Sequence, residues 1–431
     1  MRRNVGEDTH KKTSVNGTTH PENTAVSPRK KILVISPWAS RWSLGSGAGV
    51  SDDYYFIQRF TQSGYELHFV APRGENPAEL PFEDFFVHGY PDFFGATSWW
   101  PTSVKRFLWP VLFNLIVTPA ALRIARAVKP DFILGHSHYS SFPGFVTREL
   151  LRKPSGVKLF GVMDLVHSEW PASKYYFKNF EQIFALKIPQ DVWIVLDDGT
   201  KGRDAALRHG VPDEKIHWLP NGINLEWRDQ EFDPAPIRAA HDIAADSVVV
   251  LFLARFVASK RPEMLIHAIP RALQLASNRC VFVFAGDGPS RGMCEDLARS
   301  LGVESKVRFT GAIPHNDVPA LMTASNLFVS TSNMTNAAIP TCEAMVCGLP
   351  VVAFDVGDTR RLVQDGDTGI VVDDGNVTGL AEAIARLADD PDERKRMSAR
   401  AKHVAAEKLT SWDRRTGMEL EIIDEIIERH R

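Results

Sequence analysis

The chain has 431 residues, which is too long for one compact core, so we expect two domains of ordinary size. Because 50 Lys and Arg residues are balanced by 53 Asp and Glu residues, no broadly basic face is available, and we expect no nucleic-acid partner. The four cysteines form no C-x-x-C pair and no His/Cys ligand pattern, so we expect neither a zinc module nor a disulfide scaffold and favour a reducing, cytoplasmic location.

The first half of the chain predicts a disordered tail followed by an α/β domain. Residues 1–29 are polar and lack apolar periodicity, which is typical of disorder. From residue 30 onward, short apolar runs alternate with longer helix-like segments, as in right-handed βαβ units around a parallel sheet. The predicted strands are KKILVIS (30–36), ELHFV (66–70), DFILG (131–135), VKLFGV (157–162) and DVWIVL (191–196). This pattern indicates a Rossmann-like domain over 30–215.

A second α/β domain follows a stretch of turn-forming residues. The segment HWLPNGINLEWRDQEFDPAP after Ile216 suits an interdomain connection. The strand and helix alternation then restarts, which predicts a C-terminal doubly wound domain over 216–410. A last helix is expected over 411–431, with the N-terminal domain as the surface on which it would pack. Two such domains place the carboxyl ends of two sheets across a cleft, which suits a substrate held in two parts.

One apolar segment, FLWPVLFNLIVTPAAL (107–122), has sixteen residues and contains Pro110 and Pro119. A membrane-spanning helix needs roughly 20 apolar residues, so we predict no transmembrane helix here. We favour a core helix pair or helix hairpin of the first domain. The alternative is that the segment, with Trp109 inside it and Trp99 and Trp100 before it, forms an apolar face that touches a lipid acceptor or a membrane surface.

The segment NMTNAAIPTCEAMVCGLP (333–350) follows a predicted strand and carries the clearest chemical signal. Pro340 is favourable in the first turn of a helix, so the free amides near Ala338 and Ile339 should face the cleft and attract a phosphate. We expect Glu343 in the first turn, where it would accept hydrogen bonds from a sugar diol beside that phosphate. Taken alone, such a glutamate is also a common helix-capping residue.

Two further groups of residues follow predicted strands of the second domain. Arg255 and Lys260 come after an apolar strand, where two cations would neutralise a diphosphate leaving group without a metal. Gly286, Asp287 and Gly288 form a turn whose glycines allow the backbone to approach a ligand closely. Each group alone could be surface charge or turn chemistry, and only their combination favours a ligand site.

In this order, the motifs resemble those of the retaining glycosyltransferases of family 4, which have the GT-B fold of two Rossmann-like domains. The resemblance covers about 30–415. It depends on LPNGIN (219–224), RFVASKRPEMLIHA (255–268), FAGDGP (284–289), VRFTGAIPHNDVPALMTASNLFVSTS (307–332), CEAMVCGLPVVAFDVGDTRRLV (342–363) and DGDTGIVV (365–372). It implies a nucleotide-sugar donor held mainly by the second domain, an acceptor bound by the first, and no metal or cofactor.

The resemblance also assigns residues in the two domains. Arg255 and Lys260 match the basic pair that holds the donor diphosphate, and Glu343 matches the second acid of the E-x7-E motif, which binds the ribose hydroxyls. In the first domain, Gly47 is the best match to the glycine-rich turn facing the phosphates, and His138 matches a histidine near the transferred sugar.

One further first-domain position stays open, because Asp164 and His167 compete for it. The sequence also departs from the family pattern at Thr335, where the first acid of E-x7-E would fall, and at Asn336, which begins the stretch replacing Gly-Phe-Gly. The departure allows a donor recognised differently through Thr335 and Asn336, a shifted register, or a binding domain without transfer activity. We favour the first, because the basic pair and the second acid are present.

Three other functions compete with sugar transfer. A dinucleotide-dependent oxidoreductase is suggested by GSGAG at 45–49, but this motif lies about nine residues beyond the first strand and has the wrong glycine spacing. A nucleotide-sugar epimerase and a non-catalytic nucleotide-sugar binding protein would share the donor site. Our leading prediction is a retaining transferase that uses a UDP-sugar and acts on a glycolipid or polysaccharide precursor, with peripheral contact at the inner membrane face as an option.

Overall fold

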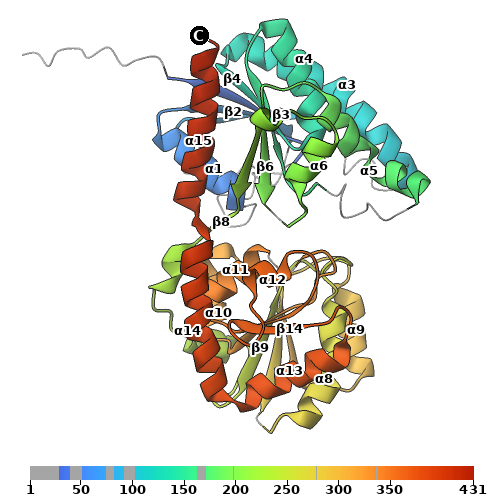
Figure 1. Ribbon diagram of the computed structural model, residues 1–431, viewed down its shortest axis with the longest axis vertical. Coiled ribbons are helices and arrows are strands. Elements are labelled where there is room, and N and C mark those ends of the chain that lie inside the picture. Colours follow the sequence, from blue (N-terminus) through green and yellow to red (C-terminus); the bar gives the residue numbers. More distant parts are fainter. Residues whose placement is uncertain are drawn as a thin grey trace, which may run out of the picture.

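The computed structural model describes residues 29–38, 51–73, 82–91, 102–162, 171–197, 199–277, 279–335 and 338–431. They form two α/β domains that follow one another along the long axis of the molecule (Figure 1). The disordered tail expected over 1–29 lies outside the described residues except for Arg29. The predicted α/β class with two parallel sheets is confirmed.

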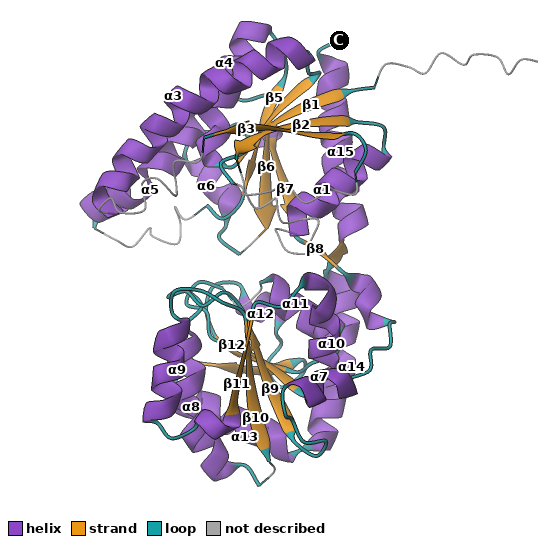
Figure 2. Ribbon diagram, turned by 180° about the vertical axis from the view of Figure 1, so that it is seen from behind, coloured by secondary structure: helices purple, strands orange, loops and turns teal. Residues whose placement is uncertain are grey.

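The N-terminal domain contains a seven-stranded parallel sheet in the order β3-β2-β1-β4-β5-β6-β7. Its central strands are continuous apolar runs because helices cover both faces, as Figure 2 shows. The strands are β1 (Lys31–Ile35), β2 (Glu66–Pro72), β3 (Phe85–Tyr90), β4 (Phe132–His136), β5 (Ser155–Leu159), β6 (Val192–Asp197) and β7 (Ile216–Pro220). The helices include α1 (Ser51–Gln62), α3 (Thr102–Val128), α4 (Ser141–Leu151), α5 (Ala172–Lys187) and α6 (Gly202–Arg208).

The boundary expected between residues 215 and 216 falls too early. Residues Ile216–Pro220 form β7, which pairs in parallel with β6 at the edge of the first sheet. Only some side chains of this strand face the core: Ile216 and Leu219 are buried, whereas Trp218 is 46% exposed. Both edge strands of this sheet, β7 and β3, therefore lack the continuous buried run by which the five strands between them were predicted, and β3 was missed altogether.

The C-terminal domain contains a six-stranded parallel sheet in the order β11-β10-β9-β12-β13-β14. Apolar clusters fill both of its faces, as in a doubly wound fold. The strands are β9 (Val248–Leu253), β10 (Cys280–Ala285), β11 (Val307–Gly311), β12 (Leu327–Ser330), β13 (Val351–Phe354) and β14 (Gly369–Val372). The helices are α7 (Ala235–Ala240), α8 (Pro262–Leu275), α9 (Arg291–Ser300), α10 (Val318–Thr323), α11 (Ile339–Val346), α12 (Thr359–Leu362), α13 (Val377–Asp389) and α14 (Pro391–Lys408).

The chain returns to the N-terminal domain at its end. The chain passes between the domains twice, after β7 and after α14. A short parallel ladder between β8 (Gly222–Ile223) and β15 (Thr410–Ser411) joins these two connections. Helix α15 (Trp412–Arg429) then runs along the N-terminal domain (Figure 1). Its isoleucines, among them Ile423 and Ile427, pack into the same core as Phe56 and Phe60 of α1. The apolar spacing of this helix thus stabilises a contact between distant parts of the sequence.

The apolar segment at 107–122 belongs to one helix, α3, and not to a helix pair or hairpin. Pro110 and Pro119 lie inside α3, because each removes only one backbone hydrogen bond from a helix of 27 residues. Among the described residues, the stretch Leu108–Val128 is long and apolar enough to cross a membrane, and 28% of its apolar window is buried. The sixteen-residue estimate from the sequence was therefore too short.

Candidate functional site

The loops at the carboxyl ends of the two sheets meet. Asp197 at the end of β6 forms an ion pair of 2.9 Å with Arg361 of α12. Gly199, with φ of +81°, lies so close to Thr335 that an added Cβ would come within 2.8 Å of the Thr335 Oγ1 atom. Since Thr335 follows β12, the two sheets face each other through their carboxyl ends, where α/β proteins bind ligands.

Helix α11 begins at Ile339 and has Pro340 in its first turn, as the sequence predicts. Glu343 lies one turn further along than expected and is only 3% exposed. Its Oε1 atom has no hydrogen-bond partner among the residues that the structure describes. Burial raises the pKa of the Glu343 carboxyl to about 8, so the group is largely protonated at neutral pH.

Arg255 and Lys260 lie in the loop that connects β9 with α8. The Thr331 Oγ1 atom donates a hydrogen bond of 2.9 Å to the Lys260 carbonyl, and the Asn333 amide donates one of 3.1 Å to the Ser259 carbonyl. These bonds join the basic loop to the segment that leads into α11. Arg255 is exposed and Lys260 is half-buried, so both stay near solvent at the edge of the sheet where α11 begins.

The turn of Gly286, Asp287 and Gly288 packs on the basic loop. Gly286 and Gly288 have φ of +125° and +150°, and an added Cβ would come within 2.0 Å of the Ala254 carbonyl oxygen and 2.5 Å of the Phe256 carbonyl oxygen. The Phe256 amide donates a hydrogen bond of 2.9 Å to the Asp287 carbonyl. The glycines are thus needed for contact between two loops, and their approach to a ligand stays a prediction.

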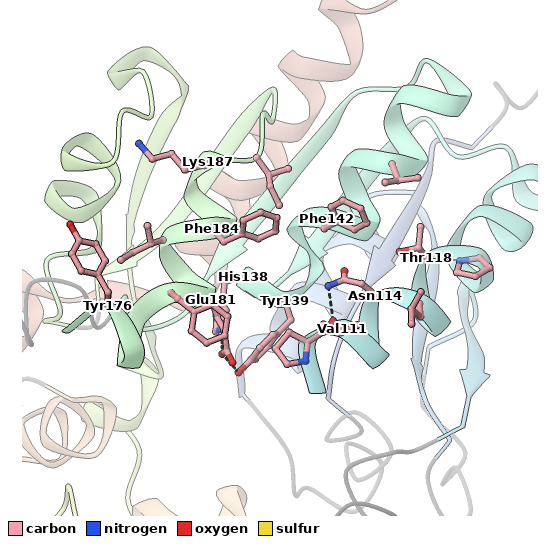
Figure 3. A pocket seen from close by; sticks show the side chains of 17 residues that line it. Val111, Asn114, Thr118, His138, Tyr139, Phe142, Tyr176, Glu181, Phe184 and Lys187 are labelled. Carbon is pink, nitrogen blue, oxygen red and sulfur yellow. Dashed lines mark hydrogen bonds and ion pairs between the residues drawn. The ribbon is translucent and has the colours of Figure 1, made fainter. Parts of the chain in front are cut away.

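The first-domain prediction that the structure describes is His138, two residues after the end of β4. Burial lowers the pKa of His138 to about 4, so its ring is neutral at neutral pH. Its Nε2 atom lies 4.0 Å from Glu181 of α5, which accepts a hydrogen bond of 2.8 Å from the Tyr139 hydroxyl (Figure 3). Ser137 has φ of 110°, a strained conformation of the kind that clusters at functional sites.

Several predicted positions fall outside the described residues, namely Gly47, Asn336, Asp164 and its competitor His167. Thr335 is described and is 6% exposed. It packs between Gly199 of the first domain and Gly357 of the second. A Cβ added at Gly357 would come within 3.2 Å of the Thr335 Cβ atom. Ala338 precedes α11 with extended backbone, which leads the chain from this contact into the helix.

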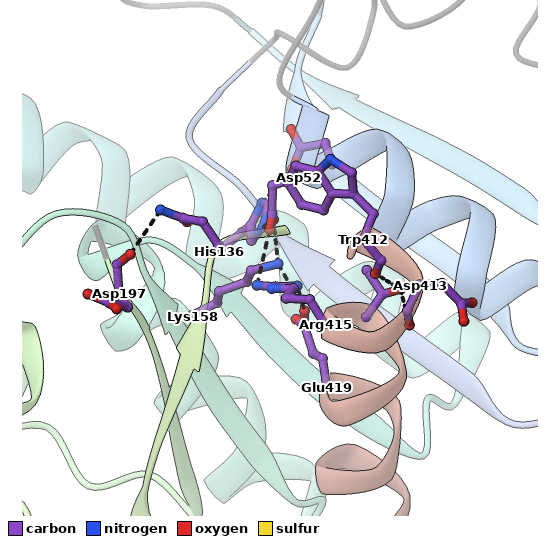
Figure 4. A network of polar contacts seen from close by, with 11 residues as sticks. Asp52, His136, Lys158, Asp197, Trp412, Asp413, Arg415 and Glu419 are labelled. Carbon is purple, nitrogen blue, oxygen red and sulfur yellow. Dashed lines mark hydrogen bonds and ion pairs between the residues drawn. The ribbon is translucent and has the colours of Figure 1, made fainter. Parts of the chain in front are cut away.

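A buried ionic cluster beneath α15 had no signal in the sequence. The Asp52 carboxylate of α1 pairs with Lys158 of β5 and with Arg415 of α15, the latter at 3.0 Å (Figure 4). Glu419 accepts from both cations, and His136 lies 3.9 Å from Asp52. Burial alone would raise the pKa of Asp52, but Arg415 and Lys158 lower it to about 2. These pairs join residues that are far apart along the chain.

Part of this cluster has the spacing of metal ligands. Asp52, Asp53 and His136 offer ligand atoms that all lie within 4.8 Å of one another. The Asp52 carboxylate already neutralises two buried cations, Lys158 and Arg415. A divalent ion would have to displace these charges, so the cluster fits a structural role better than a metal site.

Two family models match the chain. Residues 234–404 match Glycosyl transferases group 1, and residues 54–227 match Glycosyltransferase Family 4. The alpha-D-kanosaminyltransferase of Streptomyces kanamyceticus is 32% identical over 49% of this chain and 55% of the relative. The D-inositol 3-phosphate glycosyltransferase of Thermobispora bispora is 30% identical over 55% of this chain and 56% of the relative. The chain thus spans about half the length of these curated relatives.

Longer but weaker similarities extend over most of the chain. A phosphatidylinositol N-acetylglucosaminyltransferase component from Arabidopsis thaliana is 24% identical over 90% of this chain and 80% of the relative. The crystal structure of HepE from Anabaena, in complex with UDP and glucose, covers 92% of this chain and 99% of its own, with a TM-score of 0.69 and 18% identity. This likeness confirms the predicted GT-B fold.

Proposed function

The chain belongs to the group 1 glycosyltransferases of family 4, and from this membership we propose that it transfers a sugar from a nucleotide-sugar donor to an acceptor hydroxyl. The observation that carries the proposal is Glu343, a buried carboxyl with an unpartnered Oε1 atom among the described residues. It lies on α11, and the segment that leads into this helix is hydrogen-bonded to the loop that carries Arg255 and Lys260. A ribose diol beside a diphosphate has the hydroxyl donors and the negative charge that these groups complement.

Donor binding should change the charge of Glu343. Without donor, burial holds its pKa near 8. Two ribose hydroxyls that donate to the carboxylate would favour the ionised form and lower this pKa again. The donor would therefore bind more tightly to the protein with ionised Glu343. We expect donor affinity to increase as the pH rises toward 8. UDP-sugars are our first choice of donor, and HepE, with the same fold, binds UDP.

The basic loop would act on the leaving group. As the bond between the anomeric carbon and the diphosphate oxygen breaks, negative charge develops on that oxygen. Arg255, Lys260 and the amide groups at the start of α11 would stabilise this charge. The acceptor oxygen forms the new bond to the anomeric carbon, and its proton passes to the departing diphosphate. We propose retention of the anomeric configuration, with attack on the face that the leaving group occupies.

The acceptor would bind on the side of the N-terminal domain. His138 lies at the carboxyl end of β4, and a neutral imidazole there can accept or donate a hydrogen bond to a sugar hydroxyl. The contact between Thr335 and Gly199 suggests that donor sugar recognition uses Thr335 and its neighbour Asn336 in place of a first motif acid. Closure of the domains here would exclude water that competes with the acceptor.

The acceptor class and location extend the same proposal. A relative from Arabidopsis is named for a phosphatidylinositol acceptor, and a structural neighbour, WaaG, is described as involved in lipopolysaccharide biosynthesis. We therefore propose a glycolipid or polysaccharide precursor as acceptor, handled in the cytoplasm or at the inner membrane face. No metal ion enters this mechanism, because fixed cations and helix amides supply the charge.

A donor screen tests the proposed function. The protein is incubated with UDP-glucose, UDP-N-acetylglucosamine and GDP-mannose, and thermal unfolding and nucleoside diphosphate release are measured for each. We expect one donor to raise Tm and to release diphosphate, faster with an acceptor than without one. A rise in Tm without release from any donor, at any acceptor tried, would favour the non-catalytic binding protein. A product that is an isomer of the donor would favour the epimerase.

A further inference from the structure

A large apolar groove opens between α3, α4 and α5 of the N-terminal domain. Its volume is about 1010 Å³, at the upper end of the usual range for small-molecule sites. Val111 of α3 lies on one side, Tyr176 and Phe184 of α5 lie on the other, and Phe142 of α4 lies between them (Figure 3). Leu115 of α3 also lines the groove. Leu115 is 65% exposed and Phe184 is 57% exposed, so the apolar walls face solvent.

Helix α3 is apolar on both faces. Trp109, Phe113 and Val117 point to the sheet and are buried in its core. On the opposite face, Val111 and Leu115 are more than half exposed. A helix that is apolar all round is normally covered on all sides, and a contiguous exposed apolar patch marks an interaction site. We therefore expect the groove face of α3 to bind an apolar ligand.

Polar side chains gather at one end of the groove, and the Nζ atom of Lys187, which lines it elsewhere, donates a hydrogen bond of 2.6 Å to the His209 carbonyl. His138, Tyr139 and Glu181 all line it and lie close together, whereas most other lining residues are apolar. His138 comes two residues after β4, so this polar end lies at the edge of the sheet that faces the C-terminal domain. An occupant that matches the groove is apolar along most of its length and carries hydroxyl groups at the end next to the donor site.

We propose that the groove binds the hydrocarbon chain of a lipid-linked acceptor and presents its hydroxyl head group at His138. The assignment of the head group as acceptor rests on the proposed function, whereas the binding of the chain does not. A second protein surface would cover the same apolar walls, but it would have no reason to end in a polar group beside the donor site. The position of the polar end, at the sheet edge that faces the C-terminal domain, favours a substrate.

The test measures binding of n-alkyl β-glucosides with six to ten carbons, below their critical micelle concentrations, by calorimetry and without donor. We expect the affinity to rise about four-fold for each added methylene until the groove is filled. Leu115→Glu places a charge in the apolar wall and should weaken decyl glucoside binding at least ten-fold. Leu150→Glu is the matched control, because Leu150 of α4 is 58% exposed but does not line the groove.

Circular dichroism and thermal unfolding establish that both variants fold. Equal affinity for all chain lengths, or equal loss of binding in Leu115→Glu and Leu150→Glu, would overturn the proposal. So would binding to phosphatidylcholine vesicles without any binding of monomeric alkyl glucosides, which would instead indicate contact with a membrane surface. A groove already filled by another segment of the same chain would give no binding at any chain length, and this result would also overturn it.

The two proposals can fail separately. If alkyl glucosides bind but no nucleotide sugar releases its diphosphate, the binding of a hydrocarbon chain in the groove is confirmed and the proposed transferase function is wrong. If a donor is turned over equally well with methyl and decyl glucoside as acceptors, the transferase function stands and the groove proposal fails. We expect kcat/KM for decyl glucoside to exceed that for methyl glucoside, with the difference reduced in Leu115→Glu and kept in Leu150→Glu.

Discussion

Asp52 and Glu343 are both buried carboxyls, one in each domain, and their surroundings shift their pKa values in opposite directions. Asp52 is 6% exposed, and Arg415 and Lys158 outweigh its burial to lower its pKa to about 2. Glu343 is 3% exposed, and burial raises its pKa to about 8. A buried carboxylate with its cations in place is a structural element, whereas one whose partner is missing is a candidate for ligand binding. We therefore interpret the Asp52 cluster as part of the fold and Glu343 as part of a ligand site.

The largest expected effect comes from breaking the Asp52 cluster. Arg415→Met leaves Asp52 and Glu419 buried with one cation fewer, and we expect a loss of about 3–5 kcal/mol in the free energy of unfolding. Urea denaturation measures it. The control is Arg414→Met, since Arg414 is the exposed neighbour on the same helix. A loss below about 1 kcal/mol would contradict a structural role for the cluster, since that is the range of surface ion pairs.

The next effect concerns the donor side. Lys260→Ala should reduce kcat for transfer by about 10²–10³, the range for loss of one group that stabilises developing negative charge. Tm should change little, because Thr331 bonds to the Lys260 backbone carbonyl, which the variant keeps. Arg271→Ala, at an exposed position of α8, is the control. Undiminished turnover in Lys260→Ala would refute the assignment of the leaving-group site.

Glu343→Gln should separate binding from stability. The amide keeps an acceptor oxygen but loses charge-assisted bonds to the ribose, so we expect donor affinity to fall about five- to ten-fold in titration calorimetry. Since the folded pKa is raised, protonated Glu343 contributes stability that is complete below its unfolded value of 4.5 and is lost as pH rises through about 8. Without donor, the variant should therefore gain Tm relative to the native protein as the pH increases from 5 to 8.

Extending the pH series down to pH 2 adds a control at the other carboxyl. Asp52 has a lowered pKa, so its stabilising contribution is present above its unfolded value of 3.8 and is lost as pH falls toward 2. Asp52→Asn should therefore differ most from the native protein at neutral pH and least in acid. If both variants changed in the same direction with pH, the contrast between the two carboxyls would be wrong.

The elements that carry the C-terminal candidate site could be predicted because they are local in sequence, whereas the roles of their residues stay predictions. Arg255 follows a central strand with a continuous apolar run, and Pro340 signals the start of a helix. The Asp52 cluster could not be predicted, since its members come from α1, β5 and α15 and meet only in the folded chain. The groove could be predicted only in part: an apolar face of residues 107–122 toward a lipid acceptor was one alternative, but the sequence of α3 does not tell which of its two apolar faces is covered.

The smallest effect tests whether the two domains must close on Thr335. Gly199 and Gly210 have φ of +81° and +86°, so alanine at either position pays a similar backbone cost of about 1 kcal/mol. Only at Gly199 does the new Cβ meet Thr335, within 2.8 Å, whereas at Gly210 the nearest contact is the end of the Lys187 side chain at 3.9 Å. Gly199→Ala should therefore lower kcat/KM a few-fold more than Gly210→Ala at equal Tm. Since Thr335→Ala removes the Oγ1 and Cγ2 atoms, the two nearest to the new Cβ, Gly199→Ala should cost less kcat/KM in the Thr335→Ala background than in the native protein, and the absence of such coupling would mean that catalysis does not depend on this contact.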